Sequence, residues 1–200
     1  FGAAISNKIA TLFKDRTKEI EASFGCYFND AFIPGILSKS LFYSTIEKMK
    51  KLSIFEVQYE ESRVEKLKGS NIRKIIEEKK TTFQRKVRHV DDTIDLKDWG
   101  IRISSSSEDI VKPIPWKKED IEFVRLRKRT TFEGKKGTKA EGFKIDFTNV
   151  TEEGNYQQSK LEVEIERTSI TTPEKFKDLI EMIYKIIYSC SLALREDVVQ

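Results

Sequence analysis

Three glutamates near the end of the chain occupy alternate positions of one short segment. In "KLEVEIER" (160–167), Glu162, Glu164 and Glu166 alternate with apolar residues that would face a core. This period of two predicts a β-strand, because successive side chains of a strand point to opposite faces. The shared face of the three carboxylates is either simply solvated or a set of oxygen ligands for a hard cation such as Mg²⁺ or Mn²⁺.

Two other segments repeat this alternation of charged residues. "KEIEASFGCYF" (18–28) begins with Glu19 and Glu21 in one phase, and "VRLRKRTTF" (124–132) carries arginines at alternate positions. These arginines are Arg125, Arg127 and Arg129. If the first and last strands are neighbours in a closed sheet, five carboxylates converge and need a cation. The arginine face needs an anion, and the planar guanidinium suits phosphate.

An acidic wall and a basic wall inside one barrel would form a site for a metal–polyphosphate complex. The carboxylates would hold the metal, and the arginines would neutralise the phosphate oxygens. The alternative is that acidic and basic strands pair across a surface, which is worth only about 0–1 kcal/mol per exposed pair. The same two-residue phase in three separate strands favours the enclosed site.

The composition limits other kinds of site. The 200 residues include 37 Lys+Arg and 33 Asp+Glu, so the net charge of +4 lacks the large excess typical of general nucleic-acid binding. Cys26, Cys190 and His89 are the only cysteines and histidine, so we expect no zinc site and reduced thiols in an intracellular protein. The loop "GKKGTKAEG" (134–142) lacks the spacing of a phosphate-binding P-loop. No apolar run reaches the roughly 18 residues of a membrane span, and no signal peptide is evident.

The segments that must position the charged residues are predicted as eight strands and three helices. Strands are expected over 18–28, 55–62, 70–78, 81–90, 98–108, 120–133, 143–151 and 159–168, and helices over 6–18, 38–52 and 171–194. Ser38 and Thr172 are helix-cap candidates, and Pro173 suits a first helical position. "NDAFIPG" (29–35) is predicted as a turn-rich connection, and "KPIPW" (112–116) as a break. Many strands with helices mostly at the ends favour an α+β domain whose antiparallel sheet forms a closed barrel or a sandwich.

These segments together resemble the metal-dependent RNA triphosphatases of mRNA capping, the tunnel-fold type of fungi, protozoa and large DNA viruses. The resemblance covers nearly the whole chain. It is carried, in this order, by "EIEASFG", "IPGILSKSLFYSTIEKM", "DWGIRISSSSE", "VRLRKRTTF", "FKIDFTNV" and "LEVEIER". It implies that residues 1–200 form a single triphosphate-tunnel domain, a closed antiparallel barrel of about eight strands with flanking helices. Such a domain could be the N-terminal part of a larger capping enzyme.

The resemblance also implies roles for individual residues. The implied ligands of Mn²⁺ or Mg²⁺ are Glu19, Glu21 and Glu166. Glu162 and Glu164 would support that site, and Glu108 would position the attacking water. Phosphate contacts are implied for Arg73, Lys86, Arg88, Arg102, Arg125, Arg127 and Arg129. For Lys86 and Arg88 the assignment depends on the strand register, because "RKVR" permits more than one. Asp146 and Thr148 match a polar pair on the strand before the last acidic one.

The implied activity is hydrolysis of the γ-phosphate of 5′-triphosphate RNA, and of nucleoside triphosphates, by in-line attack of water. The implied partners are 5′-triphosphate RNA and the guanylyltransferase and methyltransferase of capping. Because the chain has no "KxDG" motif, we expect those activities in another chain or beyond residue 200. The location would be cytoplasmic for a viral protein and nuclear for a cellular one. The alternatives are a tunnel enzyme acting on inorganic or small triphosphates, a relative of adenylyl cyclases, and a non-catalytic barrel that binds RNA or a partner.

Overall fold

A computed structural model of the protein describes residues 1–36 and 38–199. Its strands are β1 (Glu19–Phe28), β2 (Ala31–Pro34), β3 (Phe55–Leu67), β4 (Ile72–Glu77), β5 (Thr81–Arg88), β6 (Ile94–Leu96), β7 (Ile101–Val111), β8 (Ile121–Gly134), β9 (Phe143–Glu152) and β10 (Asn155–Arg167). Its α-helices are α1 (Ala3–Phe13), α2 (Lys39–Lys50) and α3 (Pro173–Val199). Three short 3-10 turns are η1 (Val90–Asp92), η2 (Lys97–Trp99) and η3 (Lys118–Asp120).

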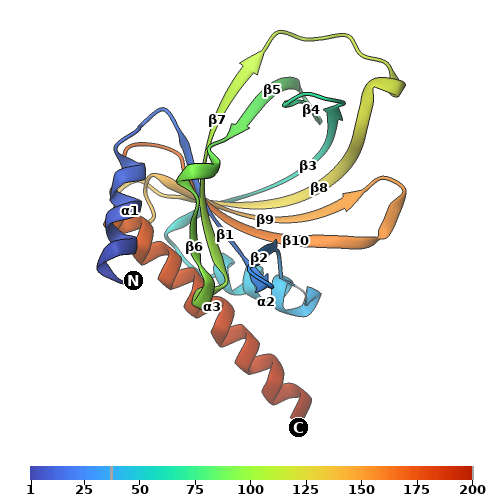
Figure 1. The fold of residues 1–200 in the computed structure, drawn as a ribbon. Coiled ribbons are helices and arrows are strands. Elements are labelled where there is room, and N and C mark those ends of the chain that lie inside the picture. The colour runs from blue at the N-terminus through green and yellow to red at the C-terminus, as the bar shows by residue number, and fades with distance from the viewer. Residues whose placement is uncertain (37, 200) are drawn as a thin grey trace.

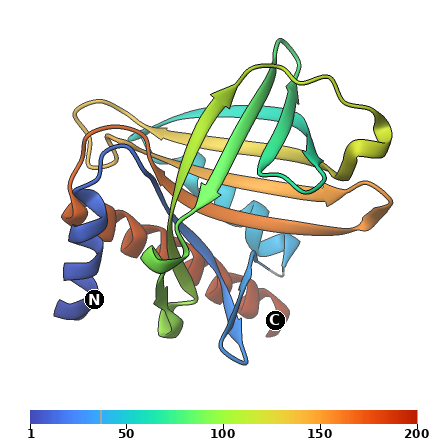
Figure 2. The ribbon, with the colours of Figure 1, turned by 45° about the horizontal axis from the view of Figure 1, so that its top comes forward.

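The long strands close into an antiparallel barrel (Figures 1 and 2). Neighbours are hydrogen-bonded in the order β1-β10-β9-β8-β3-β4-β5-β7, and β7 pairs with β1 to complete the ring. The short strands β2 and β6 extend this sheet beside β1 and β7. Closure leaves the ring strands without free edges, which confirms the predicted fold class.

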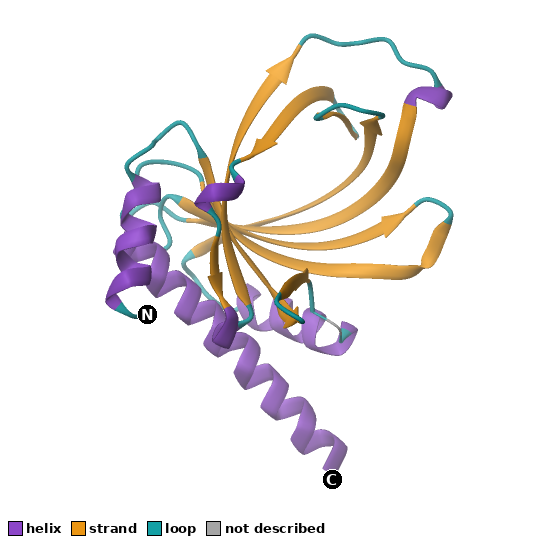
Figure 3. Cartoon of the chain, viewed as in Figure 1, coloured by secondary structure: helices purple, strands orange, loops and turns teal. Residues whose placement is uncertain are grey.

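The main hydrophobic core lies outside the barrel, between its wall and the helices. The three α-helices gather on one side of the strands (Figure 3). There the apolar residues of β10, Leu161, Val163 and Ile165, are at most 3% exposed and pack in one cluster with Ile180 and Ile183 of α3. Because the apolar phase of β10 faces this core, the alternate glutamates must face the barrel interior.

Helices α2 and α3 begin where the sequence indicates, whereas α1 runs from Ala3 to Phe13 rather than over the predicted 6–18. Ser38 accepts a hydrogen bond from the backbone N–H of Leu41 at 3.2 Å, and Thr172 accepts one from the N–H of Lys175 at 3.2 Å. Both bonds satisfy a backbone donor in the first turn of a helix. Pro173 is the first residue of α3, as predicted.

Two short strands depart from the sequence prediction. The segment 29–35, predicted as a connection without a strand, contains β2, and β6 was not predicted. Asn29 and Asp30 have φ values of 48° and 63°, and they join Phe28 to its register partner Ala31. Two residues with positive φ form the tight hairpin turn that matches the twist of its strands, so the polar pair "ND" marks a hairpin rather than an open loop.

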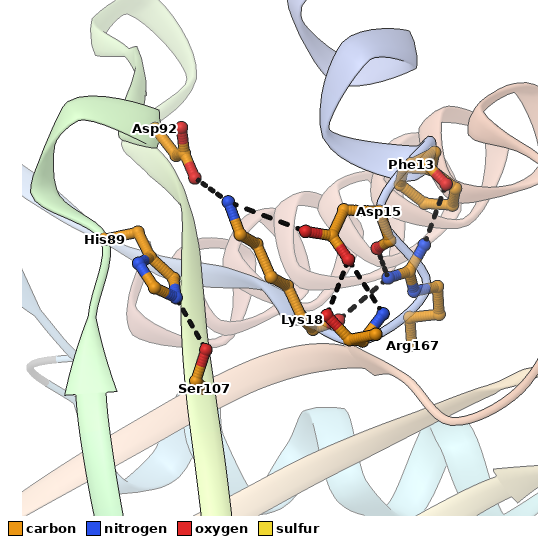
Figure 4. A network of polar contacts seen from close by, with 8 residues as sticks. Phe13, Asp15, Lys18, His89, Asp92, Ser107 and Arg167 are labelled. Carbon is orange, nitrogen blue, oxygen red and sulfur yellow. Dashed lines mark hydrogen bonds and ion pairs between the residues drawn. The ribbon is translucent and has the colours of Figure 1, made fainter.

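Arg167, the last residue of β10, ties the α1–β1 connection to the barrel (Figure 4). Its guanidinium donates to the carbonyl oxygens of Phe13, Asp15 and Lys18 at 3.3, 2.8 and 2.8 Å. The Lys18 ammonium in turn lies 3.0 Å from a carboxylate oxygen of Asp92 in η1. This network fixes the start of β1, where the first acidic pair of the sequence lies.

Candidate active site

The barrel encloses a polar cavity of about 430 Å³, here called the tunnel. Most residues predicted from the sequence line it, and they are Glu21, Arg73, Lys86, Arg88, Arg102, Glu108, Arg125, Arg127, Arg129, Asp146, Glu162, Glu164 and Glu166. Two predicted residues lie beside it instead. Glu19 lines a separate cavity at the start of β1, and Thr148 accepts a hydrogen bond from the Nε of Arg129 at 2.9 Å.

The acidic wall of the tunnel comes from neighbouring strands. Glu21 of β1 is the register partner of Glu166 of β10, and Ser23 is the partner of Glu164. Burial, followed by the charge of Glu21, raises the pKa of Glu164 to about 8. Burial also raises the pKa of Glu166 to about 7, and the neighbouring carboxyl of Glu19 adds to this shift. Because these carboxylates lie near one another and are shielded from water, a positively charged partner would stabilise their ionised forms.

Lys144 of β9 supplies part of that positive charge, and the sequence analysis missed it. Its ammonium lies 3.3 Å from a carboxylate oxygen of Glu166 and 3.8 Å from one of Asp146. Burial opposes the ionised form, but these two carboxylates together raise the pKa of Lys144. Lys144 shares the two-residue phase of Asp146 in "FKIDFTN", and this phase is the signal that could have found it.

The basic wall is formed by the alternate arginines of β8. In the ring, β9 separates β8 from β10. Arg129 is held by Thr148 and lies 3.9 Å from Asp146. Among the described residues Arg127 forms no ion pair with a carboxylate, and its Nε donates to the Oγ of Ser62 at 3.1 Å. Burial, followed by the charge of Arg129, lowers the pKa of Arg127 to about 10. A buried guanidinium of this kind favours an anionic ligand.

A third group surrounds Glu108 on β7. The Lys86 ammonium lies 3.2 Å and the Arg73 guanidinium 3.7 Å from the same carboxylate oxygen. Gln84, which the sequence analysis did not single out, donates to Glu108 at 3.1 Å and accepts from the Nε of Arg73 at 2.7 Å. Glu108 therefore has a fixed orientation among two cations and an amide.

Arg102 of β7 also lines the tunnel, as does the exposed Arg88 of β5. The Nε of Arg102 donates to Asp95 at 2.8 Å, and its guanidinium carbon lies 5.2 Å from the ring centroid of Phe32. The hydroxyl of Tyr27 donates to the same Asp95 oxygen at 2.7 Å. Arg102 is thus already partnered, and it can turn toward a phosphate only by leaving or sharing Asp95.

The donor set of the acidic wall suits a hard cation. Glu19, Glu21 and Glu166 offer only oxygen ligands, which Mg²⁺ and Mn²⁺ prefer. Glu19 and Glu166 line the same cavity at the start of β1, and Glu21 is the register partner of Glu166. In the part of the chain that the structure describes, no three acidic, histidine or cysteine side chains form a ready-made metal cluster. Lys144 gives a physical reason, because its ammonium sits against Glu166 as the counter-charge.

His89, Cys26 and Cys190 are not among the residues that line the tunnel. His89 shares a hydrogen bond of 2.7 Å with the hydroxyl of Ser107 (Figure 4). Cys26 is exposed, Cys190 is buried, and both are free thiols. None of the helices that the structure describes has both the length and the apolar character that a membrane crossing would need.

Comparisons with known proteins bear on this fold. Neither the family models nor the curated proteins give a match to the sequence. Among solved structures, the RNA triphosphatase domain of the trifunctional mimivirus mRNA capping enzyme superposes with a TM-score of 0.67 at 15% identity, covering 94% of this chain and 99% of that one. The S. pombe Pct1 RNA triphosphatase superposes with a TM-score of 0.60 at 18% identity, covering 98% and 90%.

The chain is therefore an α+β protein with a closed, charged tunnel, and its fold is that of these RNA triphosphatases. A further structure of Pct1, in complex with the Spt5 CTD, superposes with a TM-score of 0.62 at 16% identity, covering 96% of this chain and 89% of that one. At identities this low the likeness defines the fold. The function depends on the residues that line the tunnel.

Proposed function

We propose that the chain is a metal-dependent RNA 5′-triphosphatase that removes the γ-phosphate from 5′-triphosphate RNA, the first step of mRNA capping. One observation carries the proposal: a cluster of half-buried carboxylates and a row of arginines, of which Arg127 and Arg129 are half-buried and Arg125 is exposed, line the same tunnel. The carboxylates of the acidic wall need more positive charge, and the arginines of the basic wall need more negative charge. A metal–triphosphate complex would supply both. The structures that share the fold, those from mimivirus and S. pombe, are described as RNA triphosphatases.

The arginines of β8 would bind and orient the triphosphate. Arg127, whose guanidinium meets a hydroxyl rather than a carboxylate, would take phosphate oxygens directly. Arg129, braced by Thr148 and Asp146, would hold its place beside it. Positioned donors of this kind stabilise the charge that spreads over the phosphate oxygens during transfer.

Glu108 would orient the attacking water. Its carboxylate is fixed by Lys86 and Gln84, so it can accept a hydrogen bond from water in one defined direction. In-line attack needs the water on the side of the γ-phosphate opposite the leaving oxygen. No group in this arrangement needs to form a covalent bond to the substrate.

Glu19, Glu21 and Glu166 would hold the divalent cation, Mn²⁺ or Mg²⁺, with Glu162 and Glu164 in support. When bound, the cation would neutralise phosphate charge and polarise the phosphoryl group as a Lewis acid. Lys144 would then turn from Glu166 toward Asp146, its other carboxylate partner.

The test is release of γ-phosphate from 5′-triphosphate RNA with Mn²⁺ or Mg²⁺, compared with excess chelator. We expect phosphate release only with metal, and a diphosphate-ended RNA as the product. Full turnover in chelator would contradict the proposal.

Inorganic triphosphate is a second candidate substrate, because every tunnel contact described above suits phosphate oxygens and none requires a base. The same assay should therefore compare RNA, ATP and inorganic triphosphate at equal concentration. A kcat/KM for inorganic triphosphate far above that for RNA would favour a small-molecule phosphohydrolase. Absence of activity on all three, with retained RNA binding, would favour a non-catalytic binding barrel.

We further propose that residues 1–200 act as one tunnel domain in an intracellular capping apparatus. The product, a diphosphate end, is the substrate for guanylyl transfer, so a guanylyltransferase and a methyltransferase would act next, from other chains or other domains. Adding such enzymes to the product of this chain should yield capped RNA. A failure to cap that product, when chemically made diphosphate RNA is capped, would contradict this placement.

A further inference from the structure

A second cavity, of about 360 Å³, lies at one end of the tunnel, where β3 and β5 end and β4 and β8 begin. It shares five lining residues with the tunnel, which are Val64, Arg73, Lys86, Arg88 and Arg125. It adds Lys66, Asn71, Ile72 and Phe123. None of these described lining residues is acidic, although Lys66 pairs with Glu122 beside the cavity. This end of the tunnel is therefore basic and partly apolar.

Phe123 continues the inward face of β8. It lies two residues before Arg125, in the phase of the arginine row, and it is only partly buried. The guanidinium carbon of Arg125 lies 4.1 Å from the centroid of the Phe123 ring, and the ammonium of Lys66 lies 5.9 Å from it. An aromatic ring stacked with a guanidinium gives a flat platform of the kind on which nucleic-acid bases stack.

The opposite end of the barrel has a different character. There, where β1 begins and β10 ends, a cavity of about 620 Å³ has Glu19, Lys144 and Glu166 in its lining. Lys144 and Glu166 also line the tunnel. The tunnel thus runs from a basic, aromatic end to an end that carries the acidic wall. Along β8, Arg127 and Arg129 follow Phe123 and Arg125 from the first end toward the second. A triphosphate whose γ-phosphate meets the acidic wall would leave its nucleoside at the Phe123 end.

We propose that Phe123, with Arg125 stacked on it, is the platform for the first nucleobase of the triphosphate-ended substrate. The ligand class is a nucleoside 5′-triphosphate, free or at the end of RNA, threaded with its γ-phosphate toward Glu21 and Glu166. This inference rests on the proposed function and names the substrate orientation that the function leaves open. Stacking on a ring is tolerant of base identity, so the platform would serve any first nucleotide.

The test compares two hydrolysis-resistant probes, adenosine 5′-(β,γ-imido)triphosphate and inorganic imidotriphosphate, by calorimetry with Mg²⁺ present. Phe123→Leu keeps the apolar volume but removes the π-face, and we expect about tenfold weaker binding of the nucleotide probe. Binding of the inorganic probe should stay within about twofold of the wild type, because a change at an independent site alters the binding free energy by no more than about 0.5 kcal/mol. Phe123→Trp, with a larger ring, should restore or strengthen nucleotide binding.

Two controls address folding and orientation. Phe28→Leu changes a phenylalanine that is 67% exposed on the β1–β2 hairpin, and it should alter neither probe. Arg16→Ala changes the cavity at the opposite end, and it should not weaken the nucleotide selectively. Equal weakening of both probes by Phe123→Leu, no weakening at all, or a selective loss in Arg16→Ala would overturn the proposal.

Failure of the platform and failure of the proposed function give different results. If the chain is not a triphosphatase, the wild type releases no phosphate, yet the binding comparison still reports on the platform. If the platform is wrong, the wild type hydrolyses RNA, and Phe123→Leu keeps the same preference for nucleotide over inorganic triphosphate. Melting temperatures of all variants should match the wild type within a few degrees, as expected for a change of under about 1 kcal/mol.

Discussion

Glu21 of β1 and Glu166 of β10 are direct partners in the antiparallel register, so two strands at opposite ends of the chain place two carboxylates side by side in the barrel. Like charges in such cross-strand pairs are destabilising. The pair persists next to Glu164, whose pKa burial and Glu21 raise to about 8. This concentration of charge is the strongest reason to expect a cation in the tunnel, and it leads to measurable consequences.

The first prediction concerns pH in the absence of metal. The folded protein keeps protons on Glu164 and Glu166 up to pKa values of about 8 and about 7, whereas the ordinary pKa of a glutamate, which applies in the unfolded chain, is 4.5. The folded state therefore binds more protons than the unfolded state between these values, and the free energy of unfolding should fall as pH rises through this window. Thermal melts in chelator at a series of pH values check this. Glu164→Gln should flatten the slope, and a flat profile in the wild type would contradict the prediction.

The second prediction concerns the added cation. Mn²⁺ at pH 8 should raise the melting temperature of the wild type, because a ligand at 100 times its Kd stabilises the folded state by about 2.7 kcal/mol. Glu21→Gln and Glu166→Gln keep the side-chain shape but remove a charged ligand, so each should show a smaller rise. Glu119→Gln, an exposed change in η3, should behave as the wild type. An equal rise in all four proteins would place the cation elsewhere.

The third prediction separates stability from activity at Arg127. Methionine at this position removes a buried cation that has no carboxylate partner among the described residues, so the melting temperature should be unchanged or higher. The kcat for triphosphate hydrolysis should fall by about 10²–10³-fold, as for loss of one transition-state donor. Lys128→Met changes an exposed cation on the outer face of the same strand and is the matched control. A normal kcat in Arg127→Met would remove the arginine row from the mechanism.

The fourth prediction concerns Gln84, which joins Arg73 to Glu108 through two hydrogen bonds. Gln84→Leu should lower kcat by roughly tenfold while KM changes little, because a misplaced water-orienting carboxylate affects the chemical step more than binding. Arg85→Leu, the exposed neighbour on β5, serves as the control. A change confined to KM would show that Gln84 acts on substrate binding instead.

The fifth prediction concerns Arg167, whose guanidinium donates to three backbone carbonyls in the α1–β1 connection (Figure 4). Arg167→Met leaves these three carbonyl acceptors, one in a buried and two in part-buried bonds, without their donor, and loss of a buried partner costs about 1–3 kcal/mol. We expect a lower melting temperature and a weaker response to Mn²⁺, since Glu19 and Glu21 follow this connection directly. Arg167→Lys, with fewer donors, should have a melting temperature between those of the wild type and Arg167→Met. An unchanged melting temperature in Arg167→Met would show that the connection is held by other contacts.

Much of the local structure follows from the sequence alone. The alternation of Leu161, Val163 and Ile165 with glutamates predicts both the strand and its two faces, because side chains of a strand alternate by covalent geometry. Ser38 and Thr172 mark the starts of two helices, because their hydroxyls satisfy backbone donors within the next turn. The class of chemistry, carboxylates and arginines in matched phases, is also a property of the sequence.

The tertiary structure alone decides which of these faces meet. Pairing of β1 with both β10 and β7 closes the ring and turns the polar phase of each strand inward, and nothing local encodes that register. Lys144 and Gln84 become site residues only because their strands lie beside Glu166 and Glu108. Phe123 becomes part of a platform only where β8 meets β3. Sequence patterns fix the period of each strand, but contacts between strands far apart in the chain depend on how the whole sheet buries its apolar side against the helices.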